Sequence, residues 1–373
     1  MTKKADKTIT WLFAVFLAVF FALNLFTPDR DFSPKENRFL QTAPELSASS
    51  LFSGEYTRKA ETWFSDQFIW RDMWISLKAR AELLLGKSSN NGVFLCQDQR
   101  LLEAFDAPDS SVLSSRISSV NAFCGKIGVP VVFALIPSAG EIYADMLPEG
   151  ACADSQTQTI RTLYSQADCD TADLTASLAA HRGEYIYYYT DHHWTSLGAY
   201  YGYCALSDAL GYTAAKIESY HPRVVSESFL GTEYSSSGFF WVRPDSMSTY
   251  AEDPEDLVIE RFDGAQAAAG ALYNDEMLET KDKYRFFLGG NTPRIVIHTG
   301  HEELPSLLII RDSFADSLVP FLLEHFSEIH LIDLRYFYES AADYAAENRI
   351  DSVLILYSVD NFCTDSNISL LIR

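Results

Sequence analysis

Two short polar motifs contain residue types with catalytic potential. The first is 190–195 (TDHHWT), in which Asp191 stands two residues before His193. A carboxylate can hold an imidazole in one tautomer and stabilise its protonated form. The second is 311–314 (RDSF), where Ser313 follows an apolar segment. A serine hydroxyl becomes a good nucleophile when a base removes its proton, so Ser313, His193 and Asp191 together predict a catalytic triad.

Each motif also has a simpler interpretation. An Asp or Ser that follows a strand commonly caps the next helix, and Ser313 taken alone fits a cap better than a nucleophile. His and carboxylate are both zinc ligands, so Asp191, His192 and His193 are also candidates for metal binding. Adjacent histidines usually point apart, however, and no clear third or fourth ligand is nearby. The two motifs together favour catalysis, because active sites of open α/β sheets gather at the carboxyl ends of strands.

The elements that must position these motifs alternate along the chain. Continuous apolar runs predict buried parallel strands at 129–136 (VPVVFALI) and 184–189 (EYIYYY). A helix is predicted over 196–210, directly after the histidine motif. In the C-terminal part, strands over 306–310, 328–334 and 352–357 alternate with helices over 314–326 and 341–348. This order predicts a parallel sheet with right-handed crossovers, and hence an α/β fold.

The N-terminal residues are predicted to lie outside this fold. An apolar run covers 9–26, broken only by Thr10 and Asn24, and it is just long enough to cross a bilayer core of about 30 Å. Lysines precede the run, so the positive-inside rule predicts a cytoplasmic tail over 1–8 and places the rest outside the cytoplasm. We interpret 9–26 as an uncleaved signal anchor. A cleaved signal peptide is the alternative, although no small-x-small cleavage site follows.

The region after the anchor is predicted to contain a linker and one domain. Residues 27–53 are polar and include Pro34 and Pro44, which favours a linker. Helical periodicity follows over 53–86, Gly86 is a helix stop, and 93–95 is a short strand candidate. The domain is expected to cover 54–373, with an irregular insertion at 220–290 that is rich in Ser, Gly and acidic residues.

Composition narrows the classes of function. Apolar residues make up 47% of the 373 residues, which excludes disorder as the main state. One spanning run excludes a polytopic membrane protein, and a net charge of −22 argues against nucleic acid, which needs a basic surface. An even number of cysteines outside the cytoplasm permits disulfides, and Cys152 with Cys169 is the pair to test. The other four fit small buried hydrophobes equally well.

The residues 191–194 (DHHW) resemble the signature of the DHHW proteins. Further blocks that look like this family are 37–40 (NRFL), 52–54 (FSG), 64–68 (FSDQF), 71–72 (RD), 86–87 (GK), 191–203 (DHHWTSLGAYYGY), 229–232 (FLGT) and 311–322 (RDSFADSLVPFL). They span most of the chain beyond the anchor. The family is similar to the alginate O-acetyltransferases, whose catalytic domain is SGNH-hydrolase-like. The resemblance therefore implies an SGNH-hydrolase-like parallel sheet flanked by helices.

The resemblance also implies roles for single residues. In those O-acetyltransferases an Asp-x-His-Trp motif supplies the Asp and His, and a later Ser is the nucleophile. Asp191, His193, Trp194 and Ser313 match these positions, and His192 falls at the variable one. Candidate substrate or oxyanion contacts are Asn291, Trp194 and Arg311. For Asn291, in 289–291 (GGN), a plain turn is the alternative.

The activity implied is O-acetyl transfer to an extracytoplasmic polysaccharide through an acyl-enzyme on Ser313, without cofactor or metal. Because acetyl-CoA is cytosolic, the resemblance also implies a membrane-bound O-acyltransferase that delivers the acetyl group. Two alternatives are an acetyl esterase of the same fold and a non-catalytic glycan-binding or assembly protein. The presence of Asp191, His193 and Ser313 together argues against the non-catalytic alternative.

Overall fold

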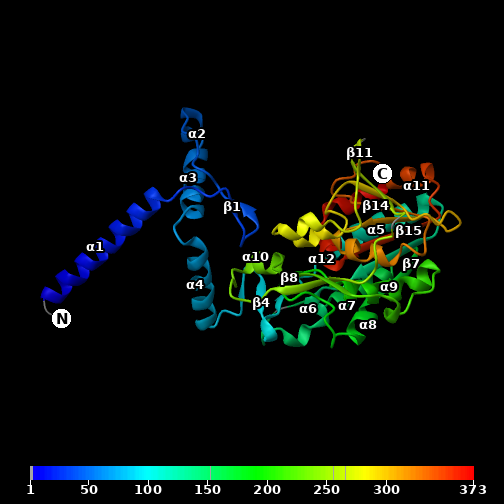
Figure 1. Ribbon diagram of the computed structural model, residues 1–373, viewed down its shortest axis with the longest axis horizontal. Coiled ribbons are helices and arrows are strands. Elements are labelled where there is room, and N and C mark those ends of the chain that lie inside the picture. Colours follow the sequence, from blue (N-terminus) through cyan, green and yellow to red (C-terminus); the bar gives the residue numbers. More distant parts are fainter. Residues whose placement is uncertain (1–2, 152, 255, 265) are drawn as a thin grey trace. The chain divides into compact units, whose positions relative to one another are not determined.

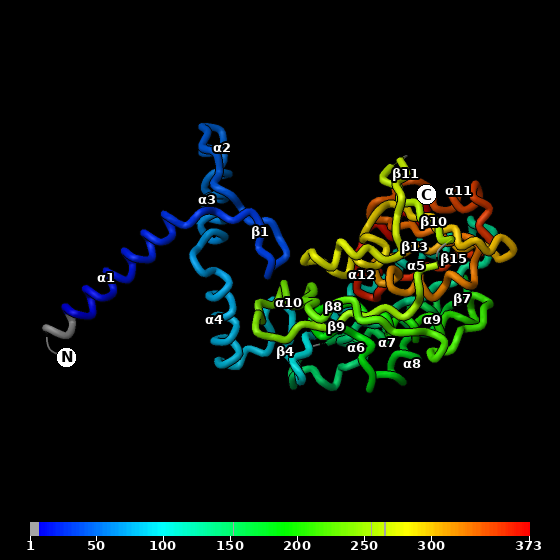
Figure 2. The backbone as a smooth tube through the Cα atoms, viewed as in Figure 1, coloured from blue at the N-terminus to red at the C-terminus, as the bar shows by residue number. Residues whose placement is uncertain are grey.

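The computed structural model describes residues 3–151, 153–254, 256–264 and 266–373, and these form two compact units (Figures 1 and 2). The smaller unit contains the chain up to Asn90 together with Tyr234–Trp241. The larger unit contains Asn91–Glu233 and Val242–Arg373. Residues 54–90, which we expected to belong to the catalytic domain, therefore fold with the N-terminal segments.

The smaller unit is built on helices. Its elements are α1 (Lys3–Phe26), β1 (Phe32–Ser33), β2 (Arg38–Phe39), α2 (Ala48–Phe52), α3 (Glu55–Asp66), α4 (Arg71–Leu84) and β3 (Ser89–Asn90). The part Lys7–Phe26 of α1 is long and apolar enough to cross a membrane. The helix expected over 53–86 is interrupted between α3 and α4, where Trp70 adopts a left-handed backbone conformation with φ 57°.

The segment expected to be a linker, 27–53, is folded against these helices. The guanidinium of Arg38 donates two hydrogen bonds to the Asp66 carboxylate, at 2.9 and 2.5 Å. The Gln41 N–H donates to the same carboxylate at 2.9 Å. Asp66 lies in α3, so the hydrogen bonds from Arg38 and Gln41 attach the segment 27–53 to that helix.

The larger unit is organised around one eight-stranded sheet. Its strands are β6 (Val131–Ile136), β7 (Asp170–Asp173), β10 (Val258–Asp263), β11 (Gln266–Ala269), β12 (Arg294–His298), β13 (Leu307–Arg311), β14 (Glu328–Ile332) and β15 (Ser352–Ser358). Their order is β11-β10-β12-β14-β13-β15-β6-β7. The pairs from β14 to β7 are parallel, and the pairs that join β12, β10 and β11 are antiparallel. The α/β fold with a mostly parallel sheet is thus confirmed.

Helices cover both faces of this sheet (Figure 1). One face packs against α5 (Ser110–Ile127), α7 (Gln156–Tyr164), α11 (Ala341–Glu347) and α12 (Val359–Thr364). The other packs against α8 (Leu174–Ala180), α9 (Ser196–Leu210), and the 3-10 helices η6 (Ser313–Ser317) and η7 (Val319–Phe321). Successive strand residues enter opposite layers, as Val132 and Phe133 of β6 do. Both layers are apolar, which explains the continuous apolar runs.

Shorter elements complete the chain. They are β4 (Val93–Leu95), β5 (Leu101–Glu103), α6 (Ala139–Ile142), β8 (Arg223–Phe229), α10 (Thr232–Ser237) and β9 (Asp245–Thr249), with 3-10 turns between them. β4 pairs with β5, and β8 pairs with β9, both antiparallel. The region 220–290 is therefore more regular than expected, and two of its strands, β10 and β11, extend the main sheet.

Two further expectations from the sequence are wrong. Residues 184–189 form no strand of the sheet; the only pairing there is an isolated bridge between Tyr187 and Trp194. The helix expected over 314–326 is replaced by η6 and η7. Pro320 explains the second difference, because proline lacks an N–H and its ring clashes with the carbonyl four residues earlier.

The expected disulfide partner Cys152 lies outside the described residues. The neighbouring Cys124 thiol, on α5, together with burial raises the pKa of the Cys169 thiol above its usual range. Both side chains are half-buried. Two cysteines that the sequence did not pair are therefore neighbours.

Candidate active site

Ser313 is held by the turn that follows β13. The Asp312 carboxylate caps η6 by accepting the Phe314 N–H at 3.0 Å. Its second oxygen accepts the N–H and hydroxyl of Ser358, each at 2.8 Å, and the Asn361 amide at 2.8 Å. Ser358 ends β15, the neighbouring strand. Asp312 therefore ties two strand ends together and fixes where Ser313 emerges.

The histidine motif lies on a hairpin-like loop rather than after a parallel strand. The Tyr189 N–H and the Thr190 N–H each donate to the buried Asp245 carboxylate at 2.8 Å, and the Thr190 hydroxyl donates at 2.5 Å. A strand would need those N–H groups for its ladder, so Asp245 explains why this apolar run leaves the sheet. The Thr195 N–H then returns to the Ile186 carbonyl at 2.9 Å, which closes the loop.

Three side chains from these two segments form a hydrogen-bonded chain. His193 Nδ1 lies 2.6 Å from Asp191 Oδ1, and His193 Nε2 lies 2.8 Å from Ser313 Oγ. Asp191 and His193 are only 3% and 5% exposed. Because a carboxylate only accepts, Nδ1 carries the proton and Nε2 can accept the Ser313 hydroxyl proton. The geometry is that of a nucleophile, a general base and an orienting carboxylate.

Asp191 is held by a second segment as well. Its Oδ2 accepts the Thr232 N–H at 2.9 Å and the Thr232 hydroxyl at 3.1 Å. The approach is close because Gly231 has no side chain: a Cβ there would lie 2.2 Å from Asp191 Oδ2. The sequence block FLGT contains both residues, but nothing in it showed that they contact Asp191.

The electrostatics suit a neutral base. Burial lowers the pKa of His193 to about 4, the nearby His192 acts in the same direction, and Asp191 opposes both. Burial alone would raise the pKa of Asp191. The attraction of His193 and His192, together with hydrogen bonds from His193 and Thr232, outweighs this and holds that pKa well below its usual range. At neutral pH the imidazole is therefore free to accept a proton, next to a charged carboxylate.

Aromatic rings fix the plane of the imidazole. The Tyr284 ring stacks on His193 with centroids 3.7 Å apart and planes 9° apart. The Tyr284 hydroxyl is held 3.0 Å from Ser317 Oγ. Phe314 lies on the imidazole at 4.8 Å. Sequence reasoning missed Tyr284, which lies far from the motif in the chain and in a segment expected to be irregular.

Trp194 and Arg311 are not placed for substrate contact, contrary to our expectation. Both are 0% exposed. The Trp194 indole N–H donates to the Phe314 carbonyl and to Ser317 Oγ, each at 3.0 Å. Arg311 forms an ion pair with Asp316 at 2.9 Å. They join the histidine loop and the serine turn to the core, so we interpret them as positioning residues.

Asp191, His193 and Ser313 line a cavity of about 490 Å³. Asn291, a candidate oxyanion donor, is among its lining residues, as is Ser313. The lining residues are Asp191, His192, His193, Thr232, Asp282, Tyr284, Arg285, Gly290, Asn291, Ser313, Asp316, Arg335 and Asn361. Asn291 also lies in a turn, because Gly289 and Gly290 before it both have positive φ. Asn291 can therefore both belong to a turn and face the cavity as an oxyanion donor.

Metal binding fits this arrangement poorly. Asp191, His192 and His193 are the one group among the described residues whose potential ligand atoms lie within 4.8 Å of one another. Both nitrogens of His193 are already hydrogen-bonded, and His192 Nδ1 lies 2.6 Å from the Thr232 hydroxyl. A metal would have to break these bonds, so the arrangement favours the hydrogen-bonded state over metal binding.

Known proteins resemble this chain in sequence and in structure. Residues 109–332 match the family described as DHHW protein, which is more than half of the chain. A probable alginate O-acetylase AlgJ from Pseudomonas syringae pv. tomato is 25% identical over 242 residues, 61% of this chain and 62% of that protein. The chain therefore spans less than two thirds of the length of this relative.

Solved structures show a similar fold. A DHHW family protein from Eubacterium siraeum superposes with a TM-score of 0.66 at 26% identity, over 76% of this chain and 95% of that chain. Bacillus cereus PatB1 with a sulfonyl adduct superposes with a TM-score of 0.62 at 21% identity, over 75% of this chain and 98% of that chain. At 21% identity the second likeness shows the fold alone.

Proposed function

Since this chain belongs to the DHHW family, we propose that it is an extracytoplasmic O-acetyltransferase that modifies a cell-envelope or secreted polysaccharide. The observation that carries the proposal is the chain of hydrogen bonds from Asp191 through His193 to Ser313, at 2.6 and 2.8 Å, at the wall of a cavity. The likeness to a probable alginate O-acetylase supports the reaction class. The hydrogen bond between His193 Nε2 and Ser313 Oγ, at 2.8 Å, supports a serine mechanism.

In the first half of the reaction, Ser313 Oγ attacks the acetyl carbonyl while His193 Nε2 takes the hydroxyl proton. His193 then gives this proton to the leaving group, and the acetyl group remains on Ser313 as an ester. The Asn291 amide and the Ser313 N–H are the proposed donors to the oxyanion. Asp191 keeps the imidazole oriented and stabilises its cationic form.

In the second half, a sugar hydroxyl attacks the acetyl-serine. His193 takes the hydroxyl proton, and the proton returns to Ser313 Oγ as the ester breaks, which leaves an O-acetylated glycan and the free enzyme. Water in place of the sugar would make the protein an esterase. The cavity is lined by basic and by acidic side chains, which the sugar acceptor can contact. The basic ones are Arg285 and Arg335, and the acidic ones are Asp282 and Asp316.

The donor must reach the site outside the cytoplasm. We propose that α1 is an uncleaved single-pass anchor that holds the protein at the membrane, where a membrane-bound O-acyltransferase delivers the acetyl group. No nucleic acid takes part, in line with the net charge of −22.

Turnover of a chromogenic acetyl ester, with and without a panel of oligosaccharides, tests the proposal. A transferase is expected to release the chromophore and to form acetylated oligosaccharide that Ser313→Ala does not form. Ester hydrolysis with no acetylated sugar from any acceptor would indicate the esterase. Folded protein that forms no acetyl adduct but binds an oligosaccharide would indicate the non-catalytic alternative.

A further inference from the structure

The end of α1 is packed against the corner between α3 and α4. The Ile69 N–H, in the corner, donates to the Asn24 side chain at 2.9 Å. The Trp63 indole of α3 donates to Asp29 at 2.7 Å, just beyond α1. These hydrogen bonds hold the corner beside the end of α1.

The contact reaches back along α1 to Phe20. Three rings of the corner surround the Phe20 ring at centroid distances of 6.4, 5.7 and 6.1 Å, and they belong to Phe68, Trp70 and Trp74. Phe20 is six residues before the last residue of α1, and at a rise of 1.5 Å per residue this is about 9 Å. Interfacial helices bury their apolar faces about 5–10 Å into the boundary between headgroups and acyl chains. If α1 spans the bilayer, the corner rings lie at that depth.

The corner exposes an apolar face. Phe64, Trp70, Met73 and Leu77 are 58, 55, 50 and 52% exposed. The last three are spaced by three and four residues, so they share one side of the chain as it enters and follows α4. Large contiguous apolar patches on a water-soluble surface are uncommon and mark an interaction site.

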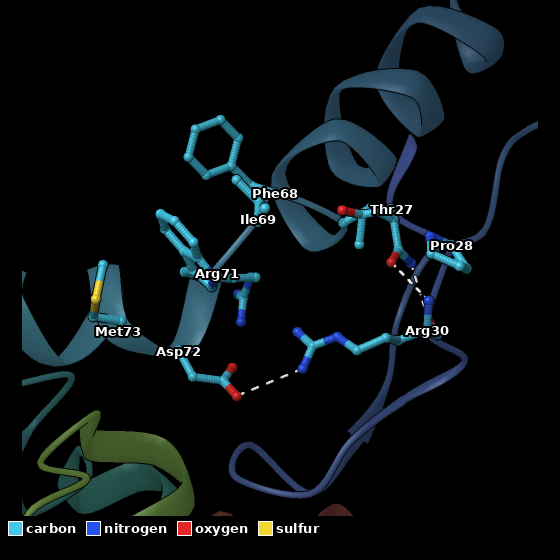
Figure 3. A pocket seen from close by; sticks show the side chains of 10 residues that line it. Thr27, Pro28, Arg30, Phe68, Ile69, Arg71, Asp72 and Met73 are labelled. Carbon is cyan, nitrogen blue, oxygen red and sulfur yellow. Dashed lines mark hydrogen bonds and ion pairs between the residues drawn. The ribbon is translucent and has the colours of Figure 1, made fainter. Parts of the chain in front are cut away.

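Charged groups lie on the other side of the corner. A cavity of about 660 Å³ separates the two, bounded by Thr27, Pro28 and residues 67–73 with Arg30. Figure 3 shows the Arg30–Asp72 ion pair, at 3.6 Å, below the cavity and the Phe68 ring above it. Apolar rings on one side and ion pairs on the other match the change of polarity at a membrane surface, where tryptophan is enriched.

We propose that the α3–α4 corner, residues 64–77, is seated in the outer interface of the lipid bilayer beside α1. The proposal rests on the anchor proposed above and adds a second membrane contact to it. The smaller unit then contacts the membrane through both α1 and the α3–α4 corner. Two contacts restrict its height and tilt relative to the membrane. Lipid is the expected occupant of this face, because the contact with Phe20 continues directly into the spanning helix.

Tryptophan fluorescence in liposomes tests this. The full chain is reconstituted in phosphatidylcholine vesicles that contain lipids with a nitroxide near the carbonyl end of the acyl chain, which quenches indoles at the interface. Trp70→Phe is expected to remove part of the lipid-quenchable emission and to leave quenching by aqueous iodide unchanged. Trp241→Phe is the matched control. Trp241 packs under Arg80, which is ten residues, about 15 Å, further along α4. Its loss is expected to leave lipid quenching unchanged.

Trp11, within α1, reports on the anchor separately. Loss of lipid quenching in Trp11→Phe but not in Trp70→Phe would keep the anchor and overturn the seated corner, above all if Trp70→Phe removed iodide quenching instead. Lipid quenching that neither substitution changes would overturn both proposals. A Trp70 indole shielded from both quenchers, in a chain that crosslinks to a second copy, would show that a protein covers the face and would also overturn the proposal.

Discussion

Gly231→Ala should damage catalysis although it replaces none of Asp191, His193 and Ser313. A Cβ at this position would lie 2.2 Å from both Cβ and Oδ2 of Asp191 and 2.5 Å from its Cγ, whereas ordinary contact begins at 3.4 Å. The separation must grow by about 1.2 Å, the difference between 3.4 and 2.2 Å. The Asp191 side chain would then leave its hydrogen bonds with Thr232 or with His193. A misplacement of about 1 Å in a catalytic group can cost roughly 100-fold in rate.

We therefore expect Gly231→Ala to lower kcat/KM for a chromogenic acetyl ester by roughly 100-fold while the chain stays folded. Gly125→Ala is the matched control, because Gly125 lies in α5 and a Cβ there would meet nothing within 4 Å. This control should retain full activity. Thermal unfolding followed by circular dichroism checks that both variants fold. Activity of folded Gly231→Ala within threefold of the parent would refute the reasoning that Asp191 must be held this tightly.

Three more outcomes are expected. Because burial lowers the pKa of His193 to about 4, kcat/KM should fall only as the pH drops through about 4; an acid limb near 6.5 would contradict the buried, neutral base. Asp245→Asn leaves buried donors around Thr190 poorly paired, so the free energy of unfolding should drop by about 1–3 kcal/mol in chemical denaturation, with activity lost in parallel; unchanged unfolding would contradict its role. Oxidised protein should contain a Cys124–Cys169 disulfide in non-reducing peptide maps, because each thiol influences the other's pKa at short range; a link from Cys169 to Cys152 instead would contradict this pairing.

The strands of the sheet could be predicted because their environment is uniform. Residues 307–311 of β13 are buried on both faces. A strand buried in this way requires a continuous run of apolar residues, and the sequence shows that run. The same rule failed at 184–189. Tyr187 and Tyr188 are also 0% exposed, but Asp245 takes backbone N–H groups that a strand would use. A buried loop has the same apolar sequence pattern as a buried strand, so composition alone could not distinguish a loop from a strand at 184–189.

The proximity of Asp191, His193 and Ser313 could be predicted because these residue types are rare together, whereas the residues that hold them in place could not. Thr232 and Asp245 act across 41 and 55 residues of sequence, and neither has a local pattern that marks a contact with the histidine loop. Arg311 and Trp194 were expected at the substrate and lie in the core, since a sequence does not show on which side of a turn a large side chain packs. Pro320 could have been used to predict that no long helix follows Ser313.

The most direct test of Ser313 as the nucleophile is the mass of the protein after exposure to an acetyl donor. The purified protein is incubated with a chromogenic acetyl ester, quenched in acid, and measured intact and after digestion, beside Ser313→Ala. We expect one added acetyl group on the peptide that contains Ser313, and none on the folded variant. An acetyl group carried elsewhere, or equal turnover by Ser313→Ala, would contradict the claim that Ser313, activated by His193 and Asp191, performs the chemistry.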